Sequence, residues 1–486
     1  MLTRDSKRLS TKDIPIKVDL MNHQRAMIYH MLTMEHTNKE MTYAMMSNKV
    51  GSGKTYVILT FIYLMSKYFK TNNHQVNLIV VPFNICSQWR VSMNAIFGPP
   101  GEMLNYSILT EYSDIMTLYH DTNKLFQYDI LLTTSLYFDN IAKTINSLKL
   151  KVKRVFFDEA DTIKNLLATP LNSDMTWFVS ASMASLFPKN TDNITIGNYK
   201  LSLSTLQKND VLCEEEFVNE NIVLPKPQVH ISTCFNIYVR LLEQINKITQ
   251  SCTIEQIHAM DYRFIKSGIA SEYNACFSLF CHYRERRSQL INLNLILEKD
   301  YERFIQRDMK EHANVIKYQI KKNKNEISLC DDIIQTFEGY NIIEEEPNQE
   351  NKISIICDLL INKIIDQTNE KETQCMCFTN FDYIYLHLKD FLTKKQISFK
   401  ELDGGNVQNM DAIINEFKEK KFAVLLADSS MYSCGMNLEN IKNILFIHRM
   451  NDHLRETQII GRAQRYGRNG TLHLWYVDYI SNLNND

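Results

Sequence analysis

The chain has 486 residues, of which 44% are hydrophobic, and its formal net charge is -2 at pH 7. A single hydrophobic core stops growing beyond roughly 250–300 residues, so we expect two or three domains. The nearly balanced charge excludes a global positive field that attracts nucleic acid. Any DNA or RNA site must therefore come from local patches and backbone groups.

The cysteines and the N-terminal segment indicate an intracellular protein. The 11 cysteines are an odd number, are scattered and form no CxxC pair, which is typical of reduced thiols rather than of a disulfide framework. Residues 1–17 are polar and charged, unlike a secretory signal. No apolar run approaches the ~18 residues that a membrane span needs, so we expect neither secretion nor membrane insertion.

The first part of the chain, residues 1–205, has the pattern of a parallel α/β sheet. Apolar runs alternate with helical stretches, and several runs are almost continuously apolar, as in strands covered on both faces. The predicted strands are Tyr43–Met46, Leu78–Val81, Ile130–Thr133, Val155–Phe157 and Phe178–Ser180. We expect these residues to form an N-terminal lobe.

Residues 206–350 have a different pattern and are predicted to form a helical middle region. Leu224–Pro227 interrupts the chain with two prolines. From about 283 to 327, apolar residues mostly recur at spacings of three and four, which predicts an amphipathic helix. Two arrangements remain open for it: a coiled-coil arm, or a packing helix in a bundle.

A second α/β pattern runs over residues 351–486, after an acidic linker at 344–350. Its predicted strands are Cys375–Phe378, Ala423–Ala427, Ile444–Ile447 and Leu472–Val477. We expect a C-terminal lobe with a parallel sheet flanked by helices.

A phosphate-binding loop is predicted directly after the first strand. In Val50-Gly51-Ser52-Gly53-Lys54-Thr55, the glycines let backbone N–H groups curl around phosphate oxygens, and the following helix adds a favourable dipole. Lys54 would reach the β- and γ-phosphates, and the Thr55 hydroxyl would hold Mg²⁺. The usual pattern has glycine or alanine five residues before Gly53, where this chain has Asn48.

An acidic pair, Asp158 and Glu159, follows the apolar strand Val155–Phe157. Because the carboxyl ends of parallel strands meet at one edge of a sheet, these acids should lie beside the phosphate loop. Asp158 would hold Mg²⁺, and Glu159 would orient and deprotonate the attacking water.

With these two motifs the chain resembles superfamily 2 helicases, which have two RecA-like lobes. The resemblance implies that Gln24 reads the adenine edge. It implies coupling between the lobes by Ser180, Ala181, Ser182 and Gln458. It also implies nucleic-acid contacts at Pro82, Trp89, Thr133, Thr134, Thr379 and Asn380. A structural strand end is the alternative for each nucleic-acid contact.

The stretch Gln458–Arg465 fits the family pattern Q-x-x-G-R-x-x-R at every fixed position. Arg462 and Arg465 are three residues apart, so both lie on one face of the predicted helix. From there they could enter a cleft between the lobes and neutralise charge on the γ-phosphate in the transition state.

Several segments favour the Swi/Snf-like group within this superfamily. Gln88-Trp89, Leu402–Gly405 and Gly435–Leu438 are similar to motifs of that group, and Gly435 is expected in the ATP site. Asp158–Asp161 also matches DEAD-box RNA helicases, but the chain lacks their Ala-x-Thr-Gly loop opening and has Gln458 in place of histidine. The Gln458–Arg468 stretch, together with a composition that indicates an AT-rich genome, is also similar to helicase-like ATPases of large cytoplasmic DNA viruses, including poxvirus transcription ATPases.

The resemblance implies an ATP hydrolase that moves along double-stranded DNA, in viral-type transcription or in DNA remodelling. An RNA helicase acting on transcripts and a partner-binding structural subunit with weak ATPase are the alternatives. ATP and Mg²⁺ are the expected cofactors. No zinc is expected, because Cys276, Cys281, His282 and Cys330 lack paired spacing. A polymerase or another protein could bind the middle region, and the location would be a viral factory, a virion or the host cytoplasm.

Overall fold

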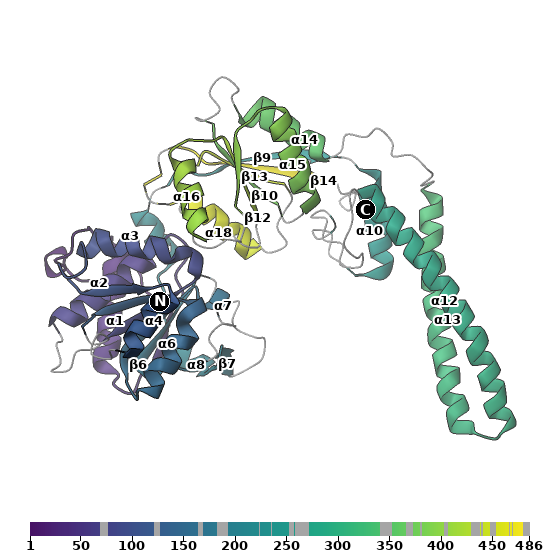
Figure 1. The fold of residues 1–486 in the computed structure, drawn as a ribbon, viewed down its shortest axis with the longest axis horizontal. Coiled ribbons are helices and arrows are strands. Elements are labelled where there is room, and N and C mark those ends of the chain that lie inside the picture. Colours follow the sequence, from purple (N-terminus) through teal and green to yellow (C-terminus); the bar gives the residue numbers. More distant parts are fainter. Residues whose placement is uncertain are drawn as a thin grey trace.

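In the computed structural model, the chain forms two parallel α/β lobes and a helical arm that projects away from them (Figure 1). The structure describes residues 1–68, 76–120, 127–163, 169–181, 193–222, 224–234, 236–251, 257, 272–340, 352–365, 373–379, 382–402, 407–428, 438, 441–447, 453–465, 467–468 and 470–479. The predicted fold class, two lobes built on parallel sheets flanked by helices, is confirmed.

The first lobe contains a six-stranded sheet in the order β1-β6-β5-β2-β4-β3, in which every neighbouring pair runs parallel. Its strands are β1 (Tyr43–Met46), β2 (Asn77–Val81), β3 (Tyr106–Leu109), β4 (Ile130–Thr134), β5 (Val152–Asp158) and β6 (Ser173–Val179). Four of the six start within three residues of a predicted strand, and β6 starts five residues before its predicted run. The edge strand β3 was not predicted, because it is short and its two central residues are only partly buried.

Helices cover both faces of this sheet, and a hydrophobic core lies on each face. The helical elements of the lobe are η1 (Thr11–Asp13), α1 (Asn22–Thr37), α2 (Lys54–Tyr68), η2 (Phe83–Ile85), α3 (Cys86–Phe97), α4 (Tyr112–His120), α6 (Ser135–Ser147), α7 (Ala160–Ile163), α8 (Leu203–Lys208) and α9 (Glu215–Asn221). An antiparallel ribbon joins β7 (Asn193–Ile196) to β8 (Tyr199–Ser202).

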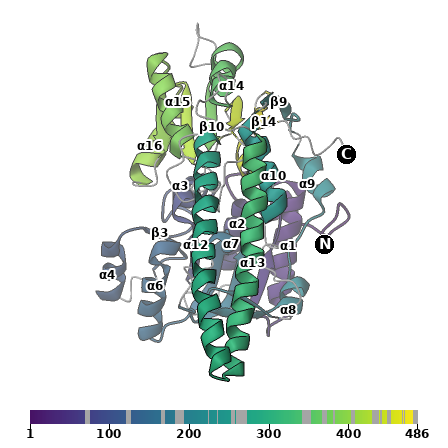
Figure 2. The ribbon, with the colours of Figure 1, turned by 90° about the vertical axis from the view of Figure 1, so that its right-hand side faces the viewer.

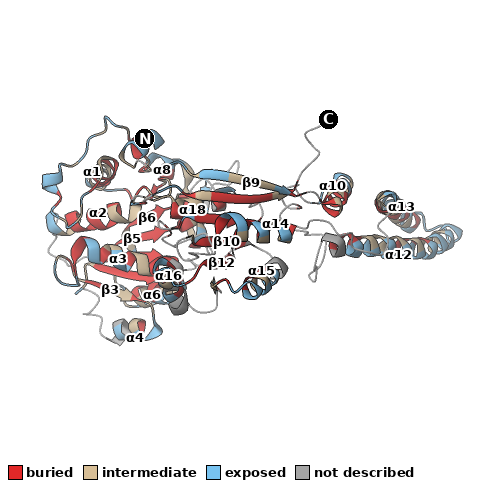
Figure 3. Ribbon diagram, turned by 90° about the horizontal axis from the view of Figure 1, so that it is seen from above, coloured by how far each residue is buried: buried red, intermediate tan, exposed pale blue. Residues whose placement is uncertain are grey.

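The second lobe contains a six-stranded sheet in the order β11-β12-β10-β13-β14-β9, again with all neighbours parallel. Its strands are β9 (Gln228–Cys234), β10 (Cys375–Thr379), β11 (Phe399–Leu402), β12 (Val424–Asp428), β13 (Asn443–Phe446) and β14 (His473–Tyr479). Its helices are α14 (Lys352–Leu359), η5 (Leu360–Ile364), α15 (Asp382–Lys394), α16 (Val407–Lys418) and α18 (His453–Ala463). Figure 3 shows the buried strands between their covering helices.

Two segments of the stretch predicted as a helical middle region lie in the lobes instead. Strand β9 pairs with β14 over its whole length and forms an edge of the second sheet. Residues 209–214 lie beside β1, where the backbone N–H of Met45 donates to Asn209 and that of Val211 donates to Met45. Edge strands make few long-range contacts, so their sequences carry a weaker burial pattern. The helical region between the lobes therefore begins at α10 (Ile237–Thr249).

The predicted amphipathic helix is two antiparallel helices, α12 (Glu272–Gln306) and α13 (Lys310–Gly339), which lie side by side in Figures 1 and 2. Asp308 adopts a left-handed backbone (φ 53°) at the turn, where the Met309 N–H donates to the Phe304 carbonyl. The apolar spacing continues across this turn, so periodicity alone could not reveal it. The base of the hairpin packs on α10 in its own core, and the rest projects as an arm (Figure 1).

A buried polar pair holds the hairpin in register. The Asn323 amide donates to Asn294 Oδ1 at 2.9 Å, and both side chains are buried between the helices. A sliding of one helix along the other would leave these amides without partners, so the pair selects one alignment. Among the described residues, no helix is long and apolar enough to cross a membrane.

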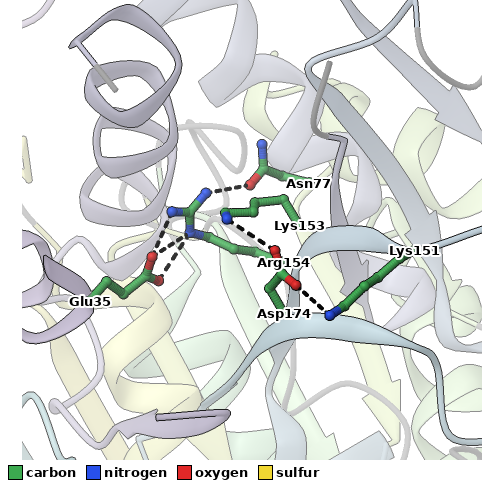
Figure 4. Close-up of polar contacts among 6 residues, drawn as sticks. All are labelled: Glu35, Asn77, Lys151, Lys153, Arg154 and Asp174. Atoms are coloured by element: carbon green, nitrogen blue, oxygen red, sulfur yellow. Dashed lines mark hydrogen bonds and ion pairs between the residues drawn. The ribbon is translucent and has the colours of Figure 1, made fainter. Parts of the chain in front are cut away.

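A buried ion pair ties α1 to the sheet of the first lobe (Figure 4). Arg154 on β5 donates to Glu35 from Nε at 2.8 Å and from Nη2 at 2.6 Å, and Asn77 accepts a further bond. Trp177 donates from its indole to the same carboxylate at 3.0 Å. Because Arg154 is only 3% exposed, each charge depends on the other for solvation.

We predict that Glu35→Gln lowers the free energy of unfolding by about 3–5 kcal/mol, because it leaves the Arg154 charge buried and unpaired. Urea unfolding of the whole chain measures this change. Asp174→Asn is the matched control, because Asp174 pairs with Lys151 and Lys153 at a partly exposed site in the same view (Figure 4). Its loss should cost about 0–1 kcal/mol. Equal effects of the two substitutions would contradict the prediction.

Candidate active site between the lobes

The phosphate loop and the acidic pair meet at the carboxyl edge of the first sheet. The loop follows β1 and the acids end β5, and only β6 lies between these parallel strands. Local structure supports both positions. Gly51 and Gly53 have φ of 81° and 79°, conformations open to glycine, and Glu159 itself has φ of 48° at the end of its strand.

The loop is supported from α1. The buried His23 ring donates from Nε2 to the Ser52 carbonyl at 3.0 Å, and Gln24 donates to the same oxygen at 3.4 Å. Gly53 has a positive φ that favours glycine, and a Cβ there would lie 2.0 Å from Gln24 Nε2, so the glutamine amide would have to move away from the loop. Gln24 Oε1 also accepts from the Met21 N–H at 2.9 Å. Gln24 therefore lies beside the loop, with its amide bonded to the chain's own backbone.

The Lys54 side chain bonds to the backbone at the start of the phosphate loop. Its Nζ donates to the Asn48 carbonyl at 2.9 Å and to the Lys49 carbonyl at 3.2 Å. Burial lowers the pKa of Lys54 despite the nearby carboxylates of Glu159 and Asp158, and the cations of Arg462 and Arg465 lower it further. The carboxylates of Asp158 and Glu159 and the guanidinium groups of Arg462 and Arg465 therefore lie close enough to Lys54 to affect its pKa.

Asn48, the departure from the usual loop pattern, has a structural explanation. Its side-chain amide donates to the Val211 carbonyl at 2.6 Å, and its Oδ1 accepts from the Cys213 N–H at 2.8 Å. The side chain is 1% exposed. A glycine could make neither bond, so Asn48 ties the start of the loop to the segment that leaves the first lobe. The sequence showed the departure but not the partners, which are more than 160 residues away.

Asp210, in the same segment, accepts from the Ser47 N–H at 3.2 Å and from its hydroxyl. Burial raises the pKa of Asp210 to about 6, above its ordinary value of 3.8. A raised carboxyl pKa means that folding favours the protonated form. The stability associated with this group is therefore present below about pH 4 and is lost as the pH rises through about 6.

We predict that Asp210→Asn stabilises the protein by about 1–2 kcal/mol above about pH 7 and gives no gain near about pH 4. The amide keeps an oxygen for the Ser47 N–H and adds an N–H for its hydroxyl, without a buried charge. Urea unfolding of both proteins across this pH range tests the expectation. A gain of equal size at both ends of the range would contradict the assignment to ionisation.

The acidic pair is buried, with Asp158 and Glu159 each 6% exposed. The Trp89 indole donates to Asp158 Oδ2 at 2.9 Å. Burial, followed by the charge of Glu159, raises the pKa of Asp158 to about 6. A cation at this carboxylate would favour its ionised form, so the environment suits a group that binds a metal ion.

The arginine helix, α18 of the second lobe, contacts this acidic pair through Arg462. Arg462 on α18 donates from Nη2 to Glu159 Oε1 at 2.8 Å, in a buried ion pair between residues 303 positions apart. Gly461 permits the approach, because a Cβ there would lie 2.8 Å from Val50 Cγ1. Gln464, at the end of the same helix, donates to the Pro225 carbonyl in the segment that joins the lobes.

Buried polar atoms at the junction fit a polar ligand. Glu159 Oε2, Arg462 Nε and the Ser52 hydroxyl are buried and have no hydrogen-bond partner among the described residues. Leaving such groups unsatisfied costs free energy, which a bound phosphate, water or cation would recover. Thr55 in the first turn of α2 and Asp158 supply a hydroxyl and a carboxylate, the oxygen ligands that Mg²⁺ takes beside phosphates. The residues present therefore fit a nucleoside triphosphate with Mg²⁺.

Four of the predicted nucleic-acid contacts have buried side chains in the structure: Pro82, Trp89, Thr133 and Thr134. The Trp89 indole donates to Asp158, and the Thr133 hydroxyl donates to the Leu109 carbonyl at 2.9 Å. Any contact of these four residues with nucleic acid would therefore involve their backbone groups, and it stays a prediction.

The remaining predicted residues are only partly described. Ser180 is buried and donates to Asp161 at 2.6 Å, and Ala181 follows it. Gln458 is 8% exposed on α18. Thr379 ends β10, but its side chain lies outside the described part of the structure. Ser182, Asn380 and Gly435 also lie outside the described residues, as do most of the Leu402–Gly405 and Gly435–Leu438 motifs. Their roles stay predictions.

Comparison with known families matches one model to each lobe. Residues 23–180 match the SNF2-related domain, and residues 351–467 match the helicase conserved C-terminal domain. These ranges contain the phosphate loop, the acidic pair and the arginine helix.

Two curated relatives show the same likeness. A protein of Acanthamoeba polyphaga mimivirus named as a helicase, R592, is 20% identical over 68% of this chain and 47% of its own. The mouse chromodomain-helicase-DNA-binding protein 1-like is 21% identical over 87% of this chain and 44% of its own. The chain therefore spans about half the length of the curated relatives it matches. Among solved structures, the Hef helicase domain of Pyrococcus furiosus has a TM-score of 0.49 and 14% identity, covering 93% of this chain and 95% of that one.

Proposed function

We propose that the chain, which is similar to the Swi/Snf-like group of superfamily 2 helicase-like ATPases in both lobes, couples ATP hydrolysis to movement along double-stranded DNA. The observation that carries the hydrolytic part is the buried contact between Arg462 and Glu159, which joins the two lobes at the phosphate loop. The first lobe supplies Lys54 and the two carboxylates, and the second lobe supplies the arginines.

Each residue has a chemical role in the proposal. Lys54 and the N–H groups of the loop bind the β- and γ-phosphates. Thr55 and Asp158 hold Mg²⁺, which neutralises phosphate charge when bound. Glu159 orients the attacking water and accepts its proton. Arg462 and Arg465 stabilise the negative charge that develops on the γ-phosphate.

The structure suggests how ligand binding changes the contact between the lobes. Arg462 is paired with Glu159 in the structure, so the base and the arginine neutralise each other. A γ-phosphate offers the guanidinium a stronger anionic partner and frees the carboxylate for water. Hydrolysis and product release restore the original pair. Alternation between the Arg462–Glu159 pair and the contact of Arg462 with the γ-phosphate would move the DNA-binding surfaces of the lobes one step in each cycle of hydrolysis.

The preference for DNA rests on the Swi/Snf-like motifs and on the printed name of the mouse relative, which describes a DNA-binding protein. A working context in viral transcription or DNA remodelling inside the infected cell agrees with the mimivirus relative. The hairpin of α12 and α13 is the part available for a polymerase or another protein, since its distal half exposes Leu295, Val315 and Tyr318 by 55–71%.

The test is a panel of nucleic acids that measures stimulation of ATP hydrolysis at several fixed salt concentrations. Duplex DNA, single-stranded DNA, single-stranded RNA and duplex RNA of matched sequence are compared, with Lys54→Ala as the inactive control. Salt must be fixed because phosphate contacts make binding strongly salt-dependent. The expected result is the largest stimulation by duplex DNA.

Other outcomes of the panel lead to the alternatives. Equal or greater stimulation by RNA favours an RNA helicase, which an unwinding assay on a tailed RNA duplex would then establish. Full biological activity of Lys54→Ala favours a structural subunit. Against that alternative, a scaffold has no physical need for Lys54, Asp158, Glu159 and the two arginines to meet at one junction.

A further inference from the structure

We infer that Trp89 is a positioning residue for the magnesium-binding carboxylate, and this inference rests on the proposed ATP site. Trp89 lies on α3 and is 2% exposed. Its indole N–H donates to Asp158 Oδ2 at 2.9 Å, across 69 positions of the sequence. The bond fills one carboxylate oxygen, and no other described residue donates a hydrogen bond to Asp158 in the structure.

The physical need for such a bond lies in the carboxylate itself. The terminal torsion of an aspartate is broad, so an unrestrained Asp158 could rotate and present its oxygens in many directions. A buried indole has few conformations, because its ring is packed within the core between α3 and the sheet. By holding Oδ2, Trp89 fixes the plane of the carboxylate and leaves Oδ1 available for a metal ion. Partners of this kind typically change metal affinity by about 10–100-fold.

The chain contains a matched control for this inference. Trp177 is also buried, and its indole donates to a buried carboxylate, Glu35, at 3.0 Å. Both indoles lie in the first lobe, and each replacement by phenylalanine removes one N–H donor and similar volume. The two carboxylates differ in position: Asp158 lies at the predicted metal site, whereas Glu35, on α1, pairs with Arg154.

The experiment measures binding of a fluorescent ADP analogue to the full chain at increasing Mg²⁺ concentration. Trp89→Phe should raise the Mg²⁺ concentration for half-maximal binding by about tenfold, and Trp177→Phe should leave it within about twofold. A shift of equal size in both variants, or none in Trp89→Phe, would overturn the inference. Failure of the wild-type chain to bind nucleotide would instead overturn the proposed function.

A second measurement does not depend on the folding of Trp89→Phe. The chain has 3 tryptophans, so ¹⁵N-labelled indoles give few signals, which Trp177→Phe and Trp475→Phe assign. Adding ADP with Mg²⁺ should shift the Trp89 indole N–H signal more than ADP alone does, because the cation polarises its acceptor. The Trp177 signal should not move. An unchanged Trp89 signal would overturn the inference.

Discussion

Arg465→Ala should lower ATP turnover by about 10³-fold or more while changing nucleotide affinity little. Arg465 lies near enough to Lys54 that its charge lowers the pKa of that lysine. We therefore expect its guanidinium to act on the charge that develops on the γ-phosphate, whereas Lys54 and the loop would hold the ground-state phosphates. Steady-state hydrolysis with saturating duplex DNA measures turnover, and equilibrium binding of an ATP analogue measures affinity.

Arg468→Ala is the matched control for this substitution. Arg468 lies three positions further along and donates to the carbonyls of Gly470, Ala463 and Thr471 at 3.0–3.3 Å. Its loss should reduce stability and leave turnover near the wild-type value in the folded protein. If Arg465→Ala hydrolyses ATP at the wild-type rate, closure of the lobes around the phosphates is not the mechanism.

Glu159→Gln should retain nucleotide binding and reduce turnover by about 10²–10⁴-fold, because an amide cannot accept the proton of the attacking water. Glutamine still presents an oxygen to Arg462, so the contact between the lobes is largely preserved. The loss should therefore appear in the hydrolysis step, which single-turnover measurements isolate.

Arg462→Ala provides the comparison for Glu159→Gln. It breaks the same buried pair from the other side, leaves the Glu159 carboxylate unpaired and removes the contact between the lobes. Weaker association of the lobes, measured as increased protease cleavage between 222 and 228, is expected for Arg462→Ala but not for Glu159→Gln. A Glu159→Gln protein with normal single-turnover rates would exclude this carboxylate as the base.

Much of the fold could be predicted from the local pattern. Central strands such as β2 and β5 contain unbroken apolar runs, Leu78–Val81 and Val155–Phe157, because helices cover both faces, and that burial is visible in the sequence. The edge strands β3, β9 and β11 were missed because they are half-covered and lack this pattern. The hairpin turn at Asp308 was missed because the helical apolar spacing continues on both sides of it.

The same distinction holds for the site. The sequence by itself determined the phosphate loop, the acidic pair and the arginine helix, because each is a short segment whose chemistry and strand-end position are local properties. Only the tertiary structure decided their partners: Arg462 with Glu159, Trp89 with Asp158 and Asn48 with Val211. Spacing along one element shows which face a side chain occupies. The residues that this face contacts depend on how distant segments of the chain pack together, and no local sequence pattern contains that information.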